Sequence, residues 1–212
     1  MDCAMALQEL VSMGVKNIVT FDAHDPRVNN AIPLDGFDNV QAAYQMIKAL
    51  LKTVPDIKLD RDHTMIVSPD EGGMGRCIYY SSVLGLELGM FYKRRNYSVI
   101  VNGRNPIEAH EFLGNDITGK DLILVDDMIS SGESMLDIAA KLKEKGAGRI
   151  FIFSTFGLFV EGFEKFDEYY KDGKIDKIFT TNLIYQPKEL LEREWYCSCL
   201  LYTSDAADEE DS

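Results

Sequence analysis

The strongest indication of the fold comes from one segment, Leu122-Ile-Leu-Val-Asp126-Asp127-Met-Ile-Ser130-Ser131-Gly132-Glu133-Ser134. Four apolar residues come first, two adjacent carboxylates follow, and a short run of serines and glycine leads into apolar residues at helical spacing. This order predicts a buried strand, then a loop, then a helix that runs to Lys145 and stops at Gly146.

The loop of this stretch has chemistry that suits a phosphorylated sugar. Backbone N–H groups and serine hydroxyls at a helix N-terminus favour a phosphate. Asp126 and Asp127 stand at the carboxyl end of a strand, where open α/β sheets bind ligands, and would take ribose hydroxyls or their metal. The alternative is a strand followed by an acidic helix cap, because Asp and Ser cap helices without any ligand.

The composition argues against several classes of function. A net charge of −13 in 212 residues argues against a nucleic-acid-binding surface, which needs a basic patch. No apolar run approaches the ~18–20 residues of a membrane span, and the N-terminus has no signal-peptide pattern. The four cysteines lack the spacing of a disulfide or zinc framework. We therefore expect a reduced, cytoplasmic enzyme with neither nucleic acid nor membrane as a partner.

Strand and helix patterns alternate along the chain. Strands are predicted over residues 17–21, 64–68, 90–92, 122–125, 150–155 and 177–181. Helices are predicted over residues 3–13, 39–52, 74–88 and 160–171, besides the one that ends at Lys145. Residues 26–37 are predicted to be loop, and residues 96–119 are open between a hairpin and a flap. The alternation predicts an α/β fold with a parallel sheet and helices on both faces.

The predicted elements fall into parts of unequal size. Residues 1–38 offer one helix and one strand, which cannot bury their apolar faces alone, so we interpret them as the remnant of an N-terminal domain. Residues 39–186 would form a complete second domain, and residues 187–199 would return toward the first. Residues 200–212 are small, acidic and aperiodic, which predicts a disordered and non-native tail.

Three further predicted strands also end in polar residues. Asp22 and His24 could hold Mg²⁺ or a nucleotide phosphate, and the alternative is a histidine that caps a strand end. The glycines of Ser68–Gly73 let backbone N–H groups face an anion, with Asp70 on a metal, and the alternative is an ordinary strand-to-helix turn. Lys93–Arg95 could neutralise a transferring phosphoryl group, and the alternative is a solvated surface run.

Together these segments resemble one known family, the ribose-phosphate pyrophosphokinases, also called phosphoribosyl pyrophosphate synthetases. Val125–Ser134 is similar to the family's ribose-5-phosphate loop, which type I phosphoribosyltransferases share. The other similar segments are Phe21–His24 with Pro33–Asp35 (its Asp-x-His segment), Ser68–Gly73 (its pyrophosphate loop) and Tyr92–Arg95 (the start of its catalytic flexible loop). They stand in the family's order, and the resemblance covers about residues 1–199.

The resemblance implies a parallel-sheet fold of the type I phosphoribosyltransferase kind, with one complete domain and the remnant of a second similar domain. It implies that ATP with Mg²⁺ gives its β,γ-pyrophosphate to the 1-hydroxyl of ribose 5-phosphate, which makes phosphoribosyl pyrophosphate and AMP for nucleotide biosynthesis. It also implies a homo-oligomer in the full-length protein. Because the family's N-terminal ATP-binding segments are absent, we expect a fragment that is not necessarily active by itself.

The resemblance implies a role for each candidate residue. Lys93, assisted by Arg95, would stabilise charge in the transition state, and Asp126 and Asp127 would hold the ribose hydroxyls. The residues implied around the 5-phosphate are Ser130, Ser131, Gly132, Glu133 and Ser134, with the Glu133 side chain pointing away. Those implied in the pyrophosphate loop are Asp70, Gly72 and Gly73, and those implied for the metal are His24, Asp70 and Asp22.

Two other functions use part of the same pattern. A type I phosphoribosyltransferase that consumes phosphoribosyl pyrophosphate would share the Asp126–Ser134 loop. A catalytically silent, phosphoribosyl pyrophosphate-binding regulatory subunit would share it as well. The Asp22-x-His24 pair and the cations that begin at Lys93 argue against the phosphoribosyltransferase, and the presence of Lys93 and Arg95 argues against a silent subunit.

Overall fold

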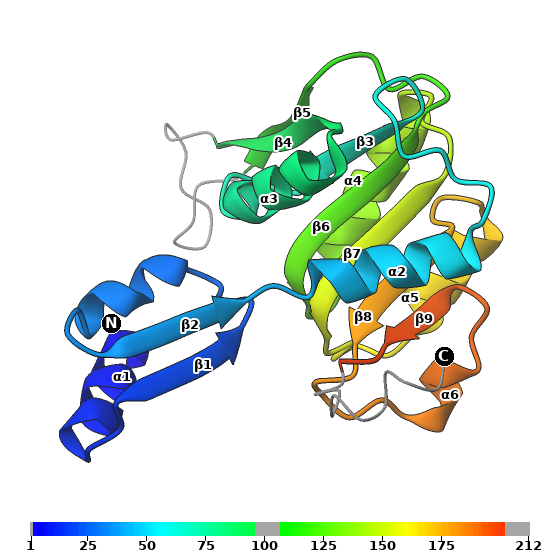
Figure 1. The fold of residues 1–212 in the computed structure, drawn as a ribbon. Coiled ribbons are helices and arrows are strands. Elements are labelled where there is room, and N and C mark those ends of the chain that lie inside the picture. Colours follow the sequence, from blue (N-terminus) through cyan, green and yellow to red (C-terminus); the bar gives the residue numbers. More distant parts are fainter. Residues whose placement is uncertain (1, 96–106, 202–212) are drawn as a thin grey trace, which may run out of the picture.

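The computed structural model describes residues 2–95 and 107–201, which form a small N-terminal unit and a larger α/β unit (Figure 1). The N-terminal unit contains α1 (Asp2–Ser12), β1 (Asn17–Phe21), the 3₁₀ helix η1 (Pro26–Ala31) and β2 (Gly36–Val40). Its two strands pair in parallel, with Ile18 beside Phe37. The chain then passes directly into the larger unit.

In the described part of the chain, the larger unit is built on a seven-stranded sheet in the order β5-β4-β3-β6-β7-β8-β9. Its strands are β3 (Thr64–Ser68), β4 (Glu87–Arg95), β5 (Ile107–Leu113), β6 (Asp121–Ile129), β7 (Ile150–Gly157), β8 (Lys177–Thr181) and β9 (Tyr196–Cys199). Neighbouring strands are parallel, except that β5 runs antiparallel to β4. The predicted α/β class with a mostly parallel sheet is confirmed.

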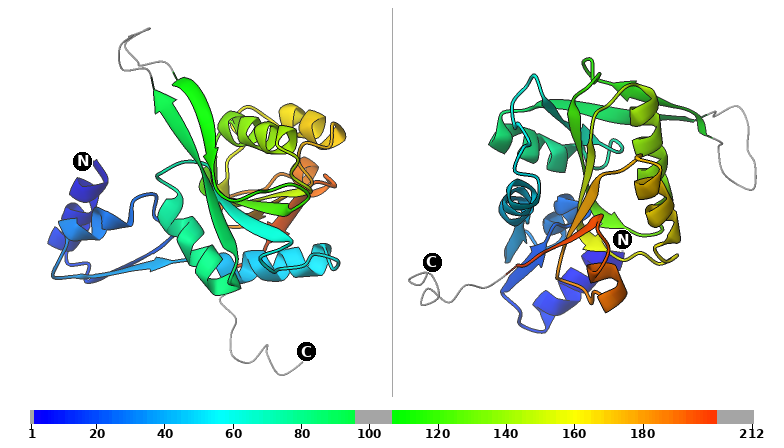
Figure 2. Two further views of the ribbon diagram at one scale, coloured as in Figure 1. Left: turned by 90° about the horizontal axis from the view of Figure 1, so that it is seen from above. Right: turned by 90° about the vertical axis from the view of Figure 1, so that its right-hand side faces the viewer.

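Helices cover both faces of this sheet, as predicted (Figure 2). One face carries α2 (Ala43–Thr53) and α3 (Met74–Leu84), and the other carries α4 (Glu133–Glu144) and α5 (Glu164–Lys171). A short helix, α6 (Lys188–Leu191), precedes β9. No helix in the described ranges is long and apolar enough to cross a membrane.

Alternating side chains of the central strands fill two cores. On β6, Leu122 and Leu124 pack into the core that includes α4, whereas Ile123 and Val125 pack into the core that includes α2 and α3. All four side chains are fully or almost fully buried. A strand that is buried on both faces reads as a continuous apolar run, which is why Leu122–Val125 was recognisable from the sequence.

Two predicted boundaries on the N-terminal side are wrong. Residues 36–40 form β2, although residues 26–37 were predicted as loop, and α2 begins at Ala43 instead of residue 39. The β2 side chains are exposed or only partly buried, so the sequence carries no apolar alternation there. The strand exists because its backbone pairs with β1, and that contact is not visible locally.

The region around α3 and β4 also differs from the prediction. The helix ends at Leu84 rather than residue 88, because Gly85 takes the left-handed conformation that closes a helix. The following strand is correspondingly longer, Glu87–Arg95. Of the residues 96–119 left open between a hairpin and a flap, residues 107–113 form β5 and pair antiparallel with β4, whereas residues 96–106 lie outside the described range.

The end of the larger unit is arranged differently from the expected return segment. Residues 196–199 form β9, which pairs with β8 and extends the larger sheet instead of returning to the N-terminal unit. Tyr196 and Cys199 are buried there. Of the predicted tail, residues 202–212 lie outside the described range.

Candidate functional site

The carboxyl end of β6 presents two aspartates and then turns tightly into α4. Asp126 and Asp127 lie on the strand, Gly132 is the residue before the helix, and Glu133 is the first helical residue. Gly132 has φ +80°, and a Cβ added there would lie 2.1 Å from the Phe166 ring of α5. Only glycine fits this position, because both its backbone conformation and the close ring exclude a side chain.

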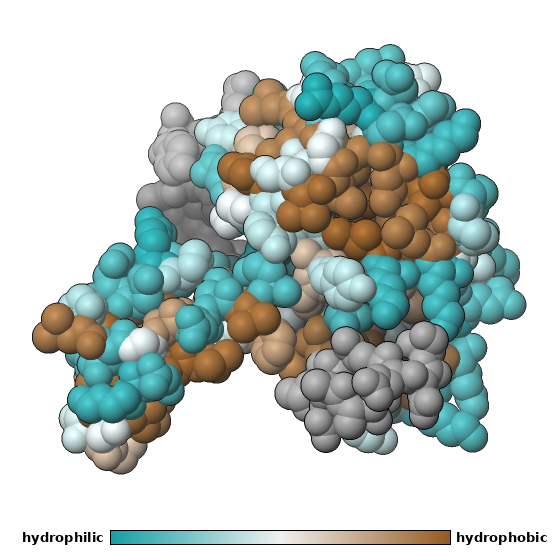
Figure 3. All heavy atoms as spheres, viewed as in Figure 1, coloured by the Kyte–Doolittle hydropathy of each residue, from teal (hydrophilic) through white to brown (hydrophobic). Residues whose placement is uncertain are grey.

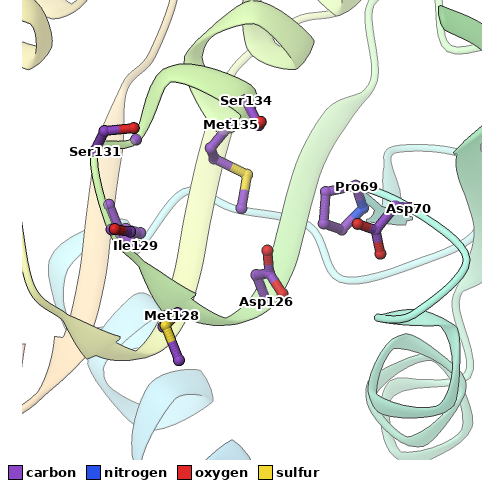
Figure 4. Close-up of a pocket in the computed structure, with 10 residues that line it drawn as sticks. Pro69, Asp70, Asp126, Met128, Ile129, Ser131, Ser134 and Met135 are labelled. Carbon is purple, nitrogen blue, oxygen red and sulfur yellow. The ribbon is translucent and has the colours of Figure 1, made fainter. Parts of the chain in front are cut away.

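This turn forms one wall of a pocket of about 200 Å³ (Figure 4). The described residues that line it are Pro69, Asp70, Asp126, Met128, Ile129, Ser130, Ser131, Gly132, Ser134 and Met135. Figure 4 shows Asp126 between the Ser131–Ser134 turn on one side and Pro69–Asp70 on the other. The predicted ribose-phosphate loop and the first part of the predicted pyrophosphate loop therefore share one pocket.

Glu133 does not contribute to this lining. Its side chain is exposed, and it adds to the electrostatic field around Lys165 of α5. Its backbone N–H donates a hydrogen bond of 3.4 Å to the Ser131 hydroxyl. This placement supports the expectation that the Glu133 carboxylate points away from a phosphate bound at the turn.

Asp127 points away from this pocket into a network of charges. The side chain is 5% exposed, and its Oδ2 lies 2.8 Å from Nδ1 of His24, a residue of the N-terminal unit. Nη2 of Arg76 lies 3.9 Å from its Oδ1. The structure therefore joins His24 and Asp127, which the sequence had placed at two separate strand ends.

Arg76, on the first turn of α3, lies at the centre of this network. Its Nε donates to both oxygens of Asp22, at 2.7 and 2.9 Å, and its Nη1 lies 3.7 Å from Asp126. The Thr155 hydroxyl of β7 donates a further hydrogen bond of 2.6 Å to Asp22. Because Asp22 is buried and both its oxygens are bound in this way, we no longer retain it as a metal ligand.

Arg76 and Thr155 were missed in the sequence. Arg76 is the one charged residue of the helix Met74–Leu84, and a lone charge among apolar helix positions, three residues after a Gly-Gly pair, was the available signal. Thr155 gave no comparable signal, because the neighbouring Ser154 of the same strand is buried as well.

Burial and neighbouring charges shift the pKa values of the ionisable side chains in this site. Burial raises the pKa of Asp126 to about 7, with further increases from neighbouring Asp127. Burial alone would also raise the pKa of Asp127, but hydrogen bonds from Asp126 and His24 and the Arg76 charge outweigh it and lower that pKa. The hydrogen bond to Asp127 raises the pKa of His24. The pKa values of the two adjacent carboxyl groups therefore shift in opposite directions.

The turn after β3 is held by its own hydrogen bonds. The Ser68 hydroxyl donates to the Asp70 carbonyl at 2.7 Å, and Asp70 Oδ1 accepts the Gly73 N–H at 3.1 Å. A Cβ at Gly73 would approach the Ser68 hydroxyl to 3.0 Å, so glycine allows the tight turn. Gly72 lies beside His24 and Arg76 in a second hollow of about 260 Å³, next to the first.

Lys93 and Arg95 lie in the last part of β4, where their backbones pair with residues 110 and 107 of β5. Their side chains lie outside the described part of the structure. The roles expected for them stay predictions.

The described residues offer part of a Mg²⁺ site rather than a closed one. In the described part of the chain, no three His, Cys, Asp or Glu side chains are grouped so that they could hold a metal ion. Magnesium in phosphate-handling sites usually keeps one or two carboxylates and completes its shell with water and phosphate oxygens. Asp126 and Asp70, which line the same pocket, fit that kind of site.

Comparison with known proteins places these features in a family. A family model described as the phosphoribosyl synthetase-associated domain matches residues 98–197. A ribose-phosphate pyrophosphokinase of Ureaplasma parvum serovar 3 is 32% identical over 174 residues, which cover 82% of this chain and 49% of that protein. The chain belongs to the ribose-phosphate pyrophosphokinase family. A ribose-phosphate pyrophosphokinase of Pyrococcus abyssi is 31% identical over 157 residues, which cover 74% of this chain and 50% of that one.

The chain thus spans about half the length of the curated ribose-phosphate pyrophosphokinases that it matches. Its fold is also similar to a solved structure, that of phosphoribosylpyrophosphate synthetase from Mycobacterium smegmatis, with a TM-score of 0.70. That likeness extends over 94% of this chain and 59% of the other, at 21% sequence identity. The pyrophosphokinase resemblance seen in the motifs therefore agrees with the sequence relationship, which covers 82% of this chain, and with the fold.

Proposed function

We propose that the protein serves the ribose-phosphate pyrophosphokinase reaction, in which ribose 5-phosphate and ATP yield phosphoribosyl pyrophosphate and AMP for nucleotide biosynthesis. The observation that carries the proposal is the pocket in which Asp126 faces the Ser131–Ser134 turn on one side and Asp70 on the other (Figure 4). A sugar phosphate and a polyphosphate must meet in such a reaction. The relationship to the ribose-phosphate pyrophosphokinases supports this pair of substrates.

The β6–α4 turn supplies the ribose-phosphate side in this proposal. The N-terminus of α4 directs backbone N–H groups and a positive dipole end toward the 5-phosphate, and Ser131 and Ser134 add hydroxyls. Asp126 accepts hydrogen bonds from the ribose hydroxyls, and Asp127, locked by His24, holds the strand end in place. These groups bind and orient the sugar so that its 1-hydroxyl faces the nucleotide.

The β3–α3 turn and the β4–β5 hairpin supply the nucleotide side. Mg²⁺, held in part by Asp70, would neutralise phosphate charge. His24, exposed at the edge of the neighbouring hollow, is placed to meet the nucleotide or its metal. Lys93 and Arg95 would stabilise the charge that develops on the transferred group. The transfer itself breaks the bond between the α- and β-phosphates of ATP and leaves AMP.

We further propose a cytoplasmic location and self-association. All four cysteines, Cys3, Cys77, Cys197 and Cys199, are free thiols, as suits a reducing compartment. An exposed apolar face between α2 and α3 supports contact with a second copy, and Figure 3 shows hydrophobic residues gathered there.

Calorimetric titration with ribose 5-phosphate, phosphoribosyl pyrophosphate and Mg·ATP in turn tests the proposed function. Binding is the sharper readout, since a chain of half the relatives' length need not turn over. We expect ribose 5-phosphate to bind, and the double variant Asp126→Asn with Asp127→Asn to lose that binding while keeping its fold. The control is Asp62→Asn, an exposed carboxylate in the turn before β3.

The titration also separates the alternatives. Binding of phosphoribosyl pyrophosphate together with a free nucleobase, but not of ribose 5-phosphate, would favour a type I phosphoribosyltransferase. Binding of phosphoribosyl pyrophosphate alone would favour a regulatory subunit. If none of the ligands binds to the folded chain, the proposed function is wrong for this polypeptide.

A further inference from the structure

We propose that Arg76, anchored by Asp22, is a positioning residue that fixes the Asp126–Asp127 pair for recognition of the ribose ring. The inference rests on the proposed function, since it assigns to Asp126 of that pair the sugar of ribose 5-phosphate. It adds a role for Arg76 and Asp22, neither of which lines the pocket that holds Asp126.

The geometry singles out Arg76 as a hub. Its guanidinium is 8% exposed and faces three carboxylates that come from two parts of the molecule. Nε binds Asp22 directly, whereas the two Nη atoms lie 3.7 Å from Asp126 and 3.9 Å from Asp127. The first contact is a hydrogen bond and the other two are ion pairs without one, so Arg76 acts on the aspartate pair through its charge and its fixed position.

The aspartate pair needs such a charge. Asp126 and Asp127 are adjacent, with side chains 28% and 5% exposed, and like charges in that setting repel each other. Burial alone would lower the pKa of Arg76, but the three carboxylates outweigh it and raise that pKa, so the guanidinium stays a cation. Without it, Asp126 would be free to reorient toward solvent, which would remove an ordered acceptor from the pocket.

The anchor on Asp22 is built rigidly. Asp22 has φ +45°, an uncommon conformation for a residue with a side chain, and the Thr155 hydroxyl binds it from β7 at 2.6 Å. A strained residue persists only where its surroundings hold it in place. Arg76 is therefore held at its Nε end, and its Nη atoms keep their direction toward the aspartate pair.

A readout that separates positioning from simple folding follows from the two parts of the ligand. The 5-phosphate contacts the Ser131–Ser134 turn, and only the ribose contacts Asp126. Inorganic phosphate therefore reports on the turn alone, whereas ribose 5-phosphate reports on the turn and the aspartate pair. The ratio of the two affinities measures sugar recognition within one folded protein.

The experiment measures this ratio by calorimetry for the full chain, Arg76→Met, Asp22→Asn and the double variant. We expect Arg76→Met to lower the ribose 5-phosphate affinity about 10- to 100-fold, the usual effect of removing an outer partner of a ligand-binding group. Phosphate affinity should change less than about threefold at physiological salt, because Arg76 does not line the pocket of the Ser131–Ser134 turn and its charge is already paired with Asp22. Asp22→Asn should lower the ratio in the same direction, although it lies outside the pocket.

The double variant tests whether the two residues act as one unit. It should lose no more sugar recognition than Arg76→Met alone, because Asp22 acts only through Arg76. The matched control is Arg149→Met, since Arg149 also bridges two aspartates, Asp121 and Asp56, but at the opposite edge of the sheet. Melting temperatures, measured alongside, identify variants that fail to fold. The double variant removes both partners of the Arg76–Asp22 pair, so neither is left as a buried charge without the other.

Three outcomes overturn the proposal in distinguishable ways. Unchanged sugar affinity in a folded Arg76→Met protein, or losses that multiply in the double variant, would contradict the positioning role alone. Equal losses for phosphate and ribose 5-phosphate would assign Arg76 to the phosphate instead. If the unchanged protein itself binds phosphate and ribose 5-phosphate equally, the proposed function fails, and the inference with it.

Discussion

At the scale of single residues, Asp126 is a carboxyl group whose charged form the fold disfavours. Burial raises its pKa to about 7, whereas the same carboxyl ordinarily ionises at 3.8. Between these values the unfolded chain releases a proton that the folded chain keeps. The stabilising contribution of Asp126 is therefore complete below pH 3.8 and is lost as the pH rises through about 7.

This sign gives a prediction for Asp126→Asn. The amide cannot ionise, so the variant should gain free energy of unfolding relative to the unchanged protein as the pH rises from 4 to 8, by about 1 kcal/mol or more. Urea unfolding at the two pH values measures the gain, with Asp62→Asn as control. If the variant and the unchanged protein differ in free energy of unfolding by the same amount at both pH values, the fold does not disfavour the ionised form of Asp126. A site that stabilises its ligand at the expense of the folded state is common among enzymes.

At the scale of secondary-structure elements, the β6–α4 turn depends on the helix that lies behind it. Gly132→Ala should destabilise the protein by about 2–4 kcal/mol, because the added Cβ combines a left-handed backbone with a collision against Phe166. It should also weaken phosphate binding, since the turn must shift. Thermal unfolding and calorimetry measure the two effects.

The control for that substitution is Gly173→Ala. Gly173 has φ +67°, and nothing lies within 4 Å of the Cβ it would gain, so only the backbone cost of about 1 kcal/mol is expected. Equal destabilisation by the two substitutions would mean that α5 does not constrain the turn.

Elements with strong local patterns were predictable, and elements made by distant pairing were not. The strand from Leu122 and the helix up to Lys145 were recognisable because each satisfies its own apolar period. β2 and β9 escaped, since each is short and forms only by pairing with a strand found elsewhere. Among site residues, the Asp126–Ser134 motif was recognisable, whereas Arg76 matters through partners that only the fold brings to it.

At the scale of the whole molecule, the face between α2 and α3 bears on assembly. The exposed residues Tyr44, Leu51, Tyr79 and Val83 surround a groove of about 510 Å³. Leu51→Glu together with Val83→Glu should shift the protein toward the monomer in sedimentation experiments, because paired carboxylates would be buried at a symmetric contact. Both side chains are about half exposed, so the fold should survive.

Leu191→Glu, at an exposed leucine of α6, is the control for that shift. An unchanged sedimentation coefficient for the double variant would exclude this face as the contact between copies. A monomer even without substitution would remove the proposal of self-association.

The ion pair between Asp22 and Arg76 also limits which substitutions such a protein can accept during evolution. Replacing only one partner would leave the other as a buried charge without its counter-charge. Neither position can therefore be replaced independently at small cost in stability. In related sequences we therefore expect the residues at positions 22 and 76 to vary together. A recombinant that joins the N-terminal unit of one homologue to the larger unit of another would keep a working pocket only when the residues at positions 22 and 76 can still form an ion pair.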